Sequence, residues 1–268
     1  MPQPREYQTE AIVIRKTKLG EADRVLTLYT PRLGKIQAKA RGVRRPRSKL
    51  AGHLELLTHS LVSLARGRSL DTVTGSQTIN SFMNVTGDLW LTSCALYAAE
   101  LVNQFTPDDL ENEAVYRLLL ATLERLGAPA GKEVVLRYFE LHLLDILGYR
   151  PELRSCVACK APLAPEVNAF SPGLGGLLCP RCLPKDPSAR PVSVNAQKVL
   201  KFFQGVEFAS AARLKLDNGL ARELETILGA YIRHILEREV KSVDWLNTLR
   251  EQIRSGRLNR PVDLVPDA

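Results

Sequence analysis

Hydrophobic and polar positions alternate over short runs in the first eighty residues of the chain. The runs TEAIVIRKTKL and RVLTLYT are separated by turn residues, and KIQAKARGV, THSLVSLARG and LDTVTGSQTI follow, a pattern typical of strands. One short helix is predicted between the third and fourth runs, over SKLAGHLELL. Five strands with a helix in that position is the order of an OB-fold, a small Greek-key barrel, although a five-stranded SH3-like barrel would give a similar pattern.

From about residue 84 the apolar positions recur at helical spacing instead. In TGDLWLTSCALYAAELVNQF one stripe is formed by Leu91, Ala95, Ala98, Val102 and Phe105. The same periodicity predicts five more helices, over DDLENEAVYRLLLATLERL, KEVVLRYFELHLLDILGY, SVNAQKVLKFFQGV, NGLARELETILGAYIRHILEREV and SVDWLNTLREQI. These runs are rich in Leu and Ala and predict a packed bundle.

Side chains within these helices are interpreted by their place in the pattern. Asp108 and Asp109 stand at the start of a predicted helix, where acids suit the helix dipole and act as caps. Trp90, His142 and Tyr231 fall in the apolar stripes and are expected to belong to the core. The tail SGRLNRPVDLVPDA has no periodic pattern and is expected to be flexible.

Four cysteines form two C-x-x-C pairs that are separated by 19 residues: Cys156, Cys159, Cys179 and Cys182. A two-residue gap lets both thiolates of a pair turn toward one ion, and two such knuckles complete a tetrahedral four-cysteine site for Zn²⁺. The ligand set is closed, with no position left for a substrate or a water molecule. We therefore expect one structural zinc ion per chain, not a catalytic one.

Other uses of four cysteines are open at this stage. Two disulfides would require an oxidising compartment, whereas the N-terminus MPQPREYQTEAIVIRK lacks the pattern of a signal peptide. A redox-active C-x-x-C motif usually follows a strand in a βαβ unit, and an iron–sulfur cluster could also use four thiolates. The fifth cysteine, Cys94, lies in an apolar helical run and is expected to be buried.

The net charge of +8 is concentrated at one end of the chain. Residues 1–80 hold fifteen Lys and Arg against six acids, an excess of nine, so the remaining 188 residues sum to −1. Such asymmetry indicates a polyanionic partner for the first eighty residues. No apolar stretch approaches the ~18 residues of a membrane span, so we expect a cytoplasmic protein without a membrane partner.

The third predicted strand puts several of these basic side chains on one face of the sheet. In KIQAKARG, Ile36, Ala38 and Ala40 share one face, and the basic residues share the other, because side chains alternate along a strand. The basic run continues into a loop that Gly42 and Pro46 keep irregular. Single charges on a sheet face are often only solvated or protect an edge. A run of seven basic residues without an acid between them instead predicts nucleic-acid contacts: Lys35, Lys39, Arg41, Arg44, Arg45, Arg47 and Lys49.

No arrangement of residues calls for catalysis. The chain lacks a Walker A motif, a G-x-S-x-G elbow and an H-E-x-x-H motif, and its four histidines are scattered. Only two aromatic residues, Tyr7 and Tyr29, occur in the first eighty, whereas OB-folds that hold single strands tightly stack bases on several aromatics. This composition favours a protein that binds phosphates and is not an enzyme.

Several segments together resemble the RecO family of bacterial recombination mediators. They are GEADRVLTLYT, the strand pattern G-K-I-x-A-x-A-R-G-x-R, the segment S-K-L-x-G-x-L-E, and LRYFELHLLDILGYRPELRSCVAC with FSPGLGGLLCPRC. The resemblance covers roughly residues 7–250. It implies an α+β multidomain fold with an N-terminal OB-fold β-barrel, an α-helical bundle and a four-cysteine zinc-ribbon-like module inserted between helices.

The resemblance also implies domain boundaries and partners. The expected parts are an OB-fold DNA-binding domain (1–80), a helical domain (81–149 and 188–254), a zinc module (150–187) and a flexible tail (255–268). Implied functions are binding of single- and double-stranded DNA, annealing of complementary strands, and loading of RecA together with RecR and single-stranded DNA-binding protein, in a nucleoid-associated cytoplasmic setting. Some members of the family lack the four cysteines, whereas this chain has all of them.

A second hypothesis belongs to another class of protein. A basic RNA-binding or ribosome-associated assembly factor with a structural zinc ribbon would show the same charge distribution and the same cysteines. Competition between DNA and structured RNA separates the two. A nuclease with an unrecognised site is a third hypothesis, which incubation with DNA and Mg²⁺ tests.

Overall fold

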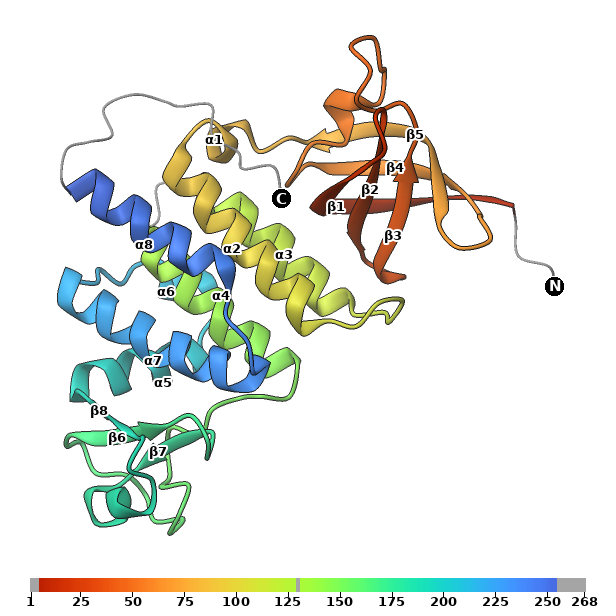
Figure 1. The fold of residues 1–268 in the computed structure, drawn as a ribbon. Coiled ribbons are helices and arrows are strands. Elements are labelled where there is room, and N and C mark those ends of the chain that lie inside the picture. Colours follow the sequence, from red (N-terminus) through yellow and green to blue (C-terminus); the bar gives the residue numbers. More distant parts are fainter. Residues whose placement is uncertain (1–4, 129–130, 255–268) are drawn as a thin grey trace. The chain divides into compact units, whose positions relative to one another are not determined.

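The structure, a computed structural model, describes residues 5–128 and 131–254 (Figure 1). The described residues form two compact units, one made of residues 5–127 with 241–254 and the other of residues 128 and 131–240. The domain boundaries predicted from the sequence stay a prediction. The predicted flexible tail, residues 255–268, lies outside the described residues.

A five-stranded closed barrel opens the first unit: β1 (Glu6–Leu19), β2 (Asp23–Thr30), β3 (Gly34–Ala40), β4 (His59–Ala65) and β5 (Asp71–Asn80) (Figure 1). The strands follow the order β1-β2-β3-β5-β4, with β4 pairing back to β1 and with β3 and β5 parallel. This is the predicted OB-fold. The helix predicted over SKLAGHLELL is reduced to one 3₁₀ turn at Ala51–His53.

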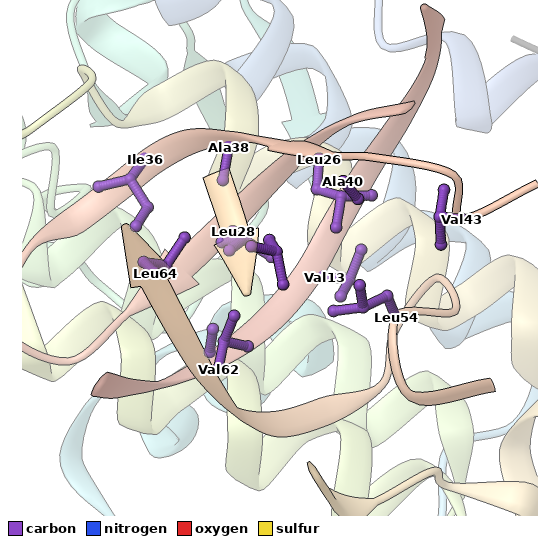
Figure 2. Close-up of a cluster of buried hydrophobic side chains, with 12 residues drawn as sticks. Val13, Leu26, Leu28, Ile36, Ala38, Ala40, Val43, Leu54, Val62 and Leu64 are labelled. Carbon is purple, nitrogen blue, oxygen red and sulfur yellow. The ribbon is translucent and has the colours of Figure 1, made fainter. Parts of the chain in front are cut away.

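Strand β1 is long enough to close the barrel because it bends. Its first half pairs with β4 and its second half with β2, and the register shifts between Val13 and Arg15. A bulge of this kind bends a strand and increases its twist. The barrel is filled by small and branched apolar side chains, which Figure 2 shows converging from all sides: Ala11, Val13, Leu26, Leu28, Ile36, Ala38, Ala40, Val43, Leu54, Val62, Leu64 and Val73.

Four helices complete the first unit: α1 (Met83–Thr86), α2 (Leu89–Phe105), α3 (Glu113–Leu126) and α8 (Lys241–Arg254). The carboxylate of Asp88 caps α2 by accepting from Leu91 N at 2.8 Å. Helix α8 packs on α2: Trp245 Nε1 donates to Ser93 Oγ at 3.0 Å, and the Glu100 carboxylate accepts from the backbone N–H groups of Lys241 and Ser242. An acidic side chain on α2 therefore satisfies the first orphan donors of α8.

The start of α3 differs from the sequence prediction. The helix begins at Glu113, and its cap is Asn112, whose side chain accepts from Val115 N at 3.1 Å. Asp108 and Asp109 lie before the helix in a non-helical segment, so the prediction that they cap its first turn is wrong. The physical reason is that a β-bridge between Asp108 and Lys35 holds this segment against β3.

The second unit contains the other predicted helices, α4 (Lys132–Ile146), α5 (Val194–Gly205) and α7 (Asn218–Leu236), and a short α6 (Phe208–Ala211). Tyr138 of α4 stacks on His142, with ring centroids 4.0 Å apart, and meets Phe203 of α5 edge-on. Between α4 and α5 the chain forms a small sheet of order β7-β6-β8, from β6 (Asn168–Ser171), β7 (Gly176–Leu178) and β8 (Arg190–Val192). This insertion carries the cysteines, as the family resemblance implied.

Candidate functional site

The loop that follows β3 presents five basic side chains to solvent. Its backbone is fixed from inside by Val43, which is buried in the barrel core, and by two turn hydrogen bonds, Arg45 N to Gly42 O and Ser48 N to Arg45 O. The side chains themselves are exposed, and we call these five residues the basic loop: Arg41, Arg44, Arg45, Arg47 and Lys49. An anchored backbone with exposed cationic side chains suits contact with a polyanion.

The basic loop is tied to the turn between β1 and β2. Arg44 donates its backbone N–H to Ala22 O at 3.0 Å and its guanidinium to Gly20 O at 3.2 Å. Asp23 accepts from Gly42 N at 2.8 Å and pairs with Lys39 Nζ at 3.1 Å. The Gly42 N–H group first, and Lys39 second, lower the pKa of the Asp23 carboxyl. The carboxylate thus orders the loop and engages part of the charge of Lys39.

Lys35 occupies a different environment from the rest of the predicted set. Its side chain is 11% exposed, and its ammonium lies 3.1 Å from Asp108 Oδ1 and donates to the carbonyl oxygen of Asn103 at 2.8 Å. Asn103 belongs to the last turn of α2, where carbonyl groups lack helical partners. Lys35 therefore caps the C-terminus of α2, a position that favours a cation.

The segment after α2 is seated on β3 by its backbone. Asp109 N donates to Lys35 O at 2.8 Å, and a Cβ at Gly34 would lie 1.9 Å from Leu110 O, so only glycine permits this approach. The structure thus brings the five residues of the basic loop together with Lys39, and it turns Lys35 toward the helices. Alternation along the strand could not reveal this, because Asp108 is far from Lys35 in the sequence.

The outer face of β1–β3 also forms a hollow of about 360 Å³ that sequence reasoning missed. It is lined by Arg15 and Thr17 of β1, Val25 and Thr27 of β2, Lys35 and Gln37 of β3, and Asn103 and Asp108. Alternation within each strand could have assigned these side chains to the outer face. The register between strands and the segment that bounds the hollow follow only from the fold.

The four cysteines converge as predicted, with all their sulfur atoms within 4.8 Å of one another. Each knuckle is held by its own backbone: Cys156 N donates to Ala161 O and Lys160 N to Cys156 O in the first, and Cys182 N to Cys179 O in the second. Gly176 of β7 lets the two halves approach, because a Cβ there would lie 2.3 Å from Glu152 O. In the part of the chain that the structure describes, this is the one group of three or more His, Cys, Asp or Glu that could hold a metal ion.

The geometry fits a tetrahedral ion. Four thiolates at about 2.3 Å from a central Zn²⁺ lie about 3.8 Å apart, and the Cys159 and Cys179 sulfur atoms are 3.9 Å apart. Burial first, and hydrogen bonds with the other three sulfur atoms next, raise the pKa of Cys182 to about 12. Burial also acts to raise the pKa of Cys156, but the N–H groups of Cys159, Cys179 and Ala158 outweigh it and hold this pKa at about 6. The cluster therefore stabilises one thiolate by itself and could hold a metal ion if the others ionise.

None of the helices in residues 5–128 and 131–254 is long and apolar enough to cross a membrane. The fold, the basic loop and the cysteine cluster together define a class of protein: an OB-fold barrel with an exposed basic loop, joined to helices that carry an inserted four-cysteine module.

Known proteins match this sequence along most of the chain. Residues 1–82 match the family described as Recombination protein O N terminal, and residues 87–244 match Recombination protein O C terminal. Curated relatives named DNA repair protein RecO include that of Dehalococcoides mccartyi strain CBDB1, 49% identical over 93% of this chain and 98% of the relative. The relative from Roseiflexus sp. strain RS-1 is 44% identical over 94% and 89% of the two chains, and that from Halalkalibacterium halodurans is 31% identical over 91% and 95%. The chain belongs to the RecO family, which confirms the resemblance.

Proposed function

We propose that this protein is a non-enzymatic recombination mediator that binds single- and double-stranded DNA and anneals complementary strands. The observation that carries the proposal is the basic loop, in which five exposed cations sit on a backbone fixed to an OB barrel. Arg and Lys side chains that neutralise phosphates give affinity without reading sequence. Such contacts leave the bases free to pair, which annealing requires.

Within the predicted DNA-binding set, we assign different roles to different residues. Arg41, Arg44, Arg45, Arg47 and Lys49 make the phosphate contacts, and Lys39 adds to them at the edge of the loop, beside Asp23. Lys35 supports the site by holding Asp108 and the end of α2.

The salt dependence of DNA binding tests this assignment. Replacing Arg41, Arg45 and Arg47 with Ala should reduce the slope of log K against log salt by roughly 0.7 per lost contact for single strands and roughly 0.9 for duplex. The matched control replaces three exposed cations of the second unit with Ala: Lys198, Lys215 and Arg222. An equal reduction of the slope in both variants would show that DNA binding depends only on the net charge of the protein. An unchanged slope in the loop variant would place the DNA elsewhere.

We further propose that the cysteine module binds one structural Zn²⁺ ion per chain through Cys156, Cys159, Cys179 and Cys182. Zn²⁺ takes sets of four cysteines with C-x-x-C spacing in structural sites and leaves no open position in them. Elemental analysis of the purified protein should find close to one zinc per chain, and its absence would refute the proposal.

The partners proposed are RecR, single-stranded DNA-binding protein and, indirectly, RecA, in the cytoplasm at the nucleoid. Membership of the RecO family supports them. A strand-annealing assay on DNA coated with single-stranded DNA-binding protein tests the combined activity. If structured RNA competed better than DNA in that assay, the protein would instead be an RNA-binding assembly factor.

A further inference from the structure

The hollow on the outer face of β1–β3 has walls that are set by strand register. Arg15 of β1 lies opposite Thr27 of β2, which lies opposite Gln37 of β3, so these three side chains form one row across the sheet. Thr17 and Val25 form the next row. The lining is polar apart from Val25, and the volume of 360 Å³ is near the lower end for small-ligand sites, which is room enough for one planar ring system.

The lining of the hollow includes one carboxylate, that of Asp108. Asp108 Oδ1 lies 3.1 Å from Lys35 Nζ, and Oδ2 accepts from Gln37 Nε2 at 3.3 Å. The side chain of Asp108 is still 49% exposed. Each carboxylate oxygen can accept more than one hydrogen bond, so Asp108 can accept from a ligand while Lys35 balances its charge.

The lining holds two cations, Arg15 and Lys35, and one carboxylate, and Lys35 is already engaged by Asp108 and Asn103 O. The Asp108 carboxylate would repel an anion, whereas it would accept a hydrogen bond from a neutral donor, so this part of the hollow favours a neutral group over a phosphate. Asp and Glu accept in this way from the exocyclic amino group of cytosine. The planar guanidinium of Arg15 can stack on a base, and the hydroxyl groups of Thr17 and Thr27 can donate or accept at its edge.

We propose that the hollow receives one unpaired nucleobase that carries an exocyclic amino group, with Asp108 as the acceptor for that group and Arg15 as the stacking partner. The proposal rests on the proposed function, since it assigns to the same barrel a contact that only single strands can make. In a duplex the faces of the bases are covered by their neighbours, so a paired base cannot stack on Arg15, although the amino group of a paired cytosine still offers one hydrogen atom in the major groove. The basic loop therefore sets affinity for DNA of either kind, and the hollow adds a preference among single strands.

The test compares oligo(dC) with oligo(dU), whose bases differ at position 4, which carries an amino group or a carbonyl oxygen, and at N3, which is an acceptor in cytosine and an N–H donor in uracil. Fluorescence anisotropy at fixed salt should show oligo(dC) binding about fivefold more tightly, the scale of one hydrogen bond to a charged group that is partly exposed. Asp108→Asn should bring the two affinities within about twofold of each other, because an amide can donate to the carbonyl oxygen of uracil. Equal affinities for the two strands in the unmodified protein would overturn the proposal.

A second variant does not depend on the Asp108–Lys35 pair. Arg15→Lys keeps the charge at an exposed position and removes the planar group. It should weaken binding to oligo(dC) about threefold and leave duplex affinity unchanged. If duplex and single strand weakened equally, Arg15 would be a phosphate contact and not a stacking partner, and the proposal would fail.

Two further arms separate the possible outcomes. Arg47→Ala should weaken oligo(dC) and oligo(dU) by equal factors and should also weaken duplex binding, because a phosphate contact does not read the base. If Arg47→Ala left all of these affinities unchanged, the proposed function would be refuted. If the loop variant weakened binding as expected but the unmodified protein showed no preference for oligo(dC), only the base site would be refuted. Free dCMP lacks the other phosphates that the basic loop contacts, so it should displace oligo(dC) only at concentrations far above that of the strand, and displacement at equal concentration would assign the hollow to a free nucleotide instead of a strand.

Discussion

Replacement of Lys35 with Met should destabilise the first unit without a matching effect on DNA binding. Methionine keeps the apolar stem of the side chain, so the change removes the ammonium and little of the packing. The substitution removes the hydrogen bond to Asn103 O at 2.8 Å and the ion pair with Asp108 at 3.1 Å. Loss of the hydrogen bond leaves a carbonyl at the end of α2 without this donor.

The size of the effect follows from the exposure of the two partners. A hydrogen bond from a charged donor to a carbonyl contributes about 1.5–3 kcal/mol when it is shielded, as the Lys35 side chain is at 11% exposure. The ion pair adds less than about 1 kcal/mol, because solvent screens the half-exposed Asp108. Since methionine also avoids the cost of burying a charge, we expect a net loss of about 2 kcal/mol in the free energy of unfolding.

Urea unfolding followed by tryptophan fluorescence measures this loss, because both tryptophans, Trp90 and Trp245, belong to the first unit. Lys49→Met is the matched control: it removes the same group from an exposed position, so it should change stability by less than about 0.5 kcal/mol. The effects on DNA binding should be reversed: Lys49→Met should flatten the salt dependence of DNA binding, whereas Lys35→Met should leave it unchanged. A stable Lys35→Met protein with a flattened slope would refute the assignment of Lys35 as a helix cap.

Three further predictions concern the other parts of the molecule. Cys159→Ser should lower bound zinc well below one per chain and loosen residues 150–187, which limited proteolysis would detect. DNA affinity should change less than stability. Unchanged zinc content would contradict the assignment of four cysteine ligands. Hydrogen bonds from the Ser171 and Ser188 hydroxyl groups lower the pKa of Asp186, so its stabilising effect should be fully present above the unfolded value of about 3.9 and be lost as pH falls through the lower folded value. The difference in melting temperature between the unmodified protein and Asp186→Asn should therefore shrink toward acid pH, and a constant difference would count against it. A labelled peptide with the acidic, apolar tail of single-stranded DNA-binding protein should still bind the Arg41/Arg45/Arg47→Ala variant, because we expect it to dock on the helices; loss of binding would place it on the barrel.

Local patterns were sufficient to predict the barrel and the cysteine cluster. Ile36, Ala38 and Ala40 alternate with polar residues, and they are buried in the barrel core. The C-x-x-C spacing fixes each knuckle within a short stretch, and the cluster then requires only that Cys156 and Cys179 lie on neighbouring segments. In both cases the information is contained in a local part of the chain.

Contacts between distant segments could not be predicted in the same way. The pairing of Lys35 with Asp108 depends on how the chain returns from α2, and the acids before α3 resembled caps when considered alone. The hollow has the same origin, because its walls come from three strands, the last turn of α2 and the segment after it. Of the predicted DNA contacts, five are exposed as expected, and their role in binding stays a prediction.

The packing of α8 on α2 has a consequence for the order in which the protein can fold during synthesis. The chain leaves the first unit after Gly127 and re-enters it at Lys241, so the second unit is a covalent insertion in the first. Residues 128–240 are contiguous and can fold as soon as they emerge from the ribosome, whereas α2 must wait for Trp245, Leu246 and Leu249. The unit that begins the chain is thus the last to be completed. A single cut within the insertion would end the covalent link between α2 and α8, and packing alone would then keep α8 in the first unit.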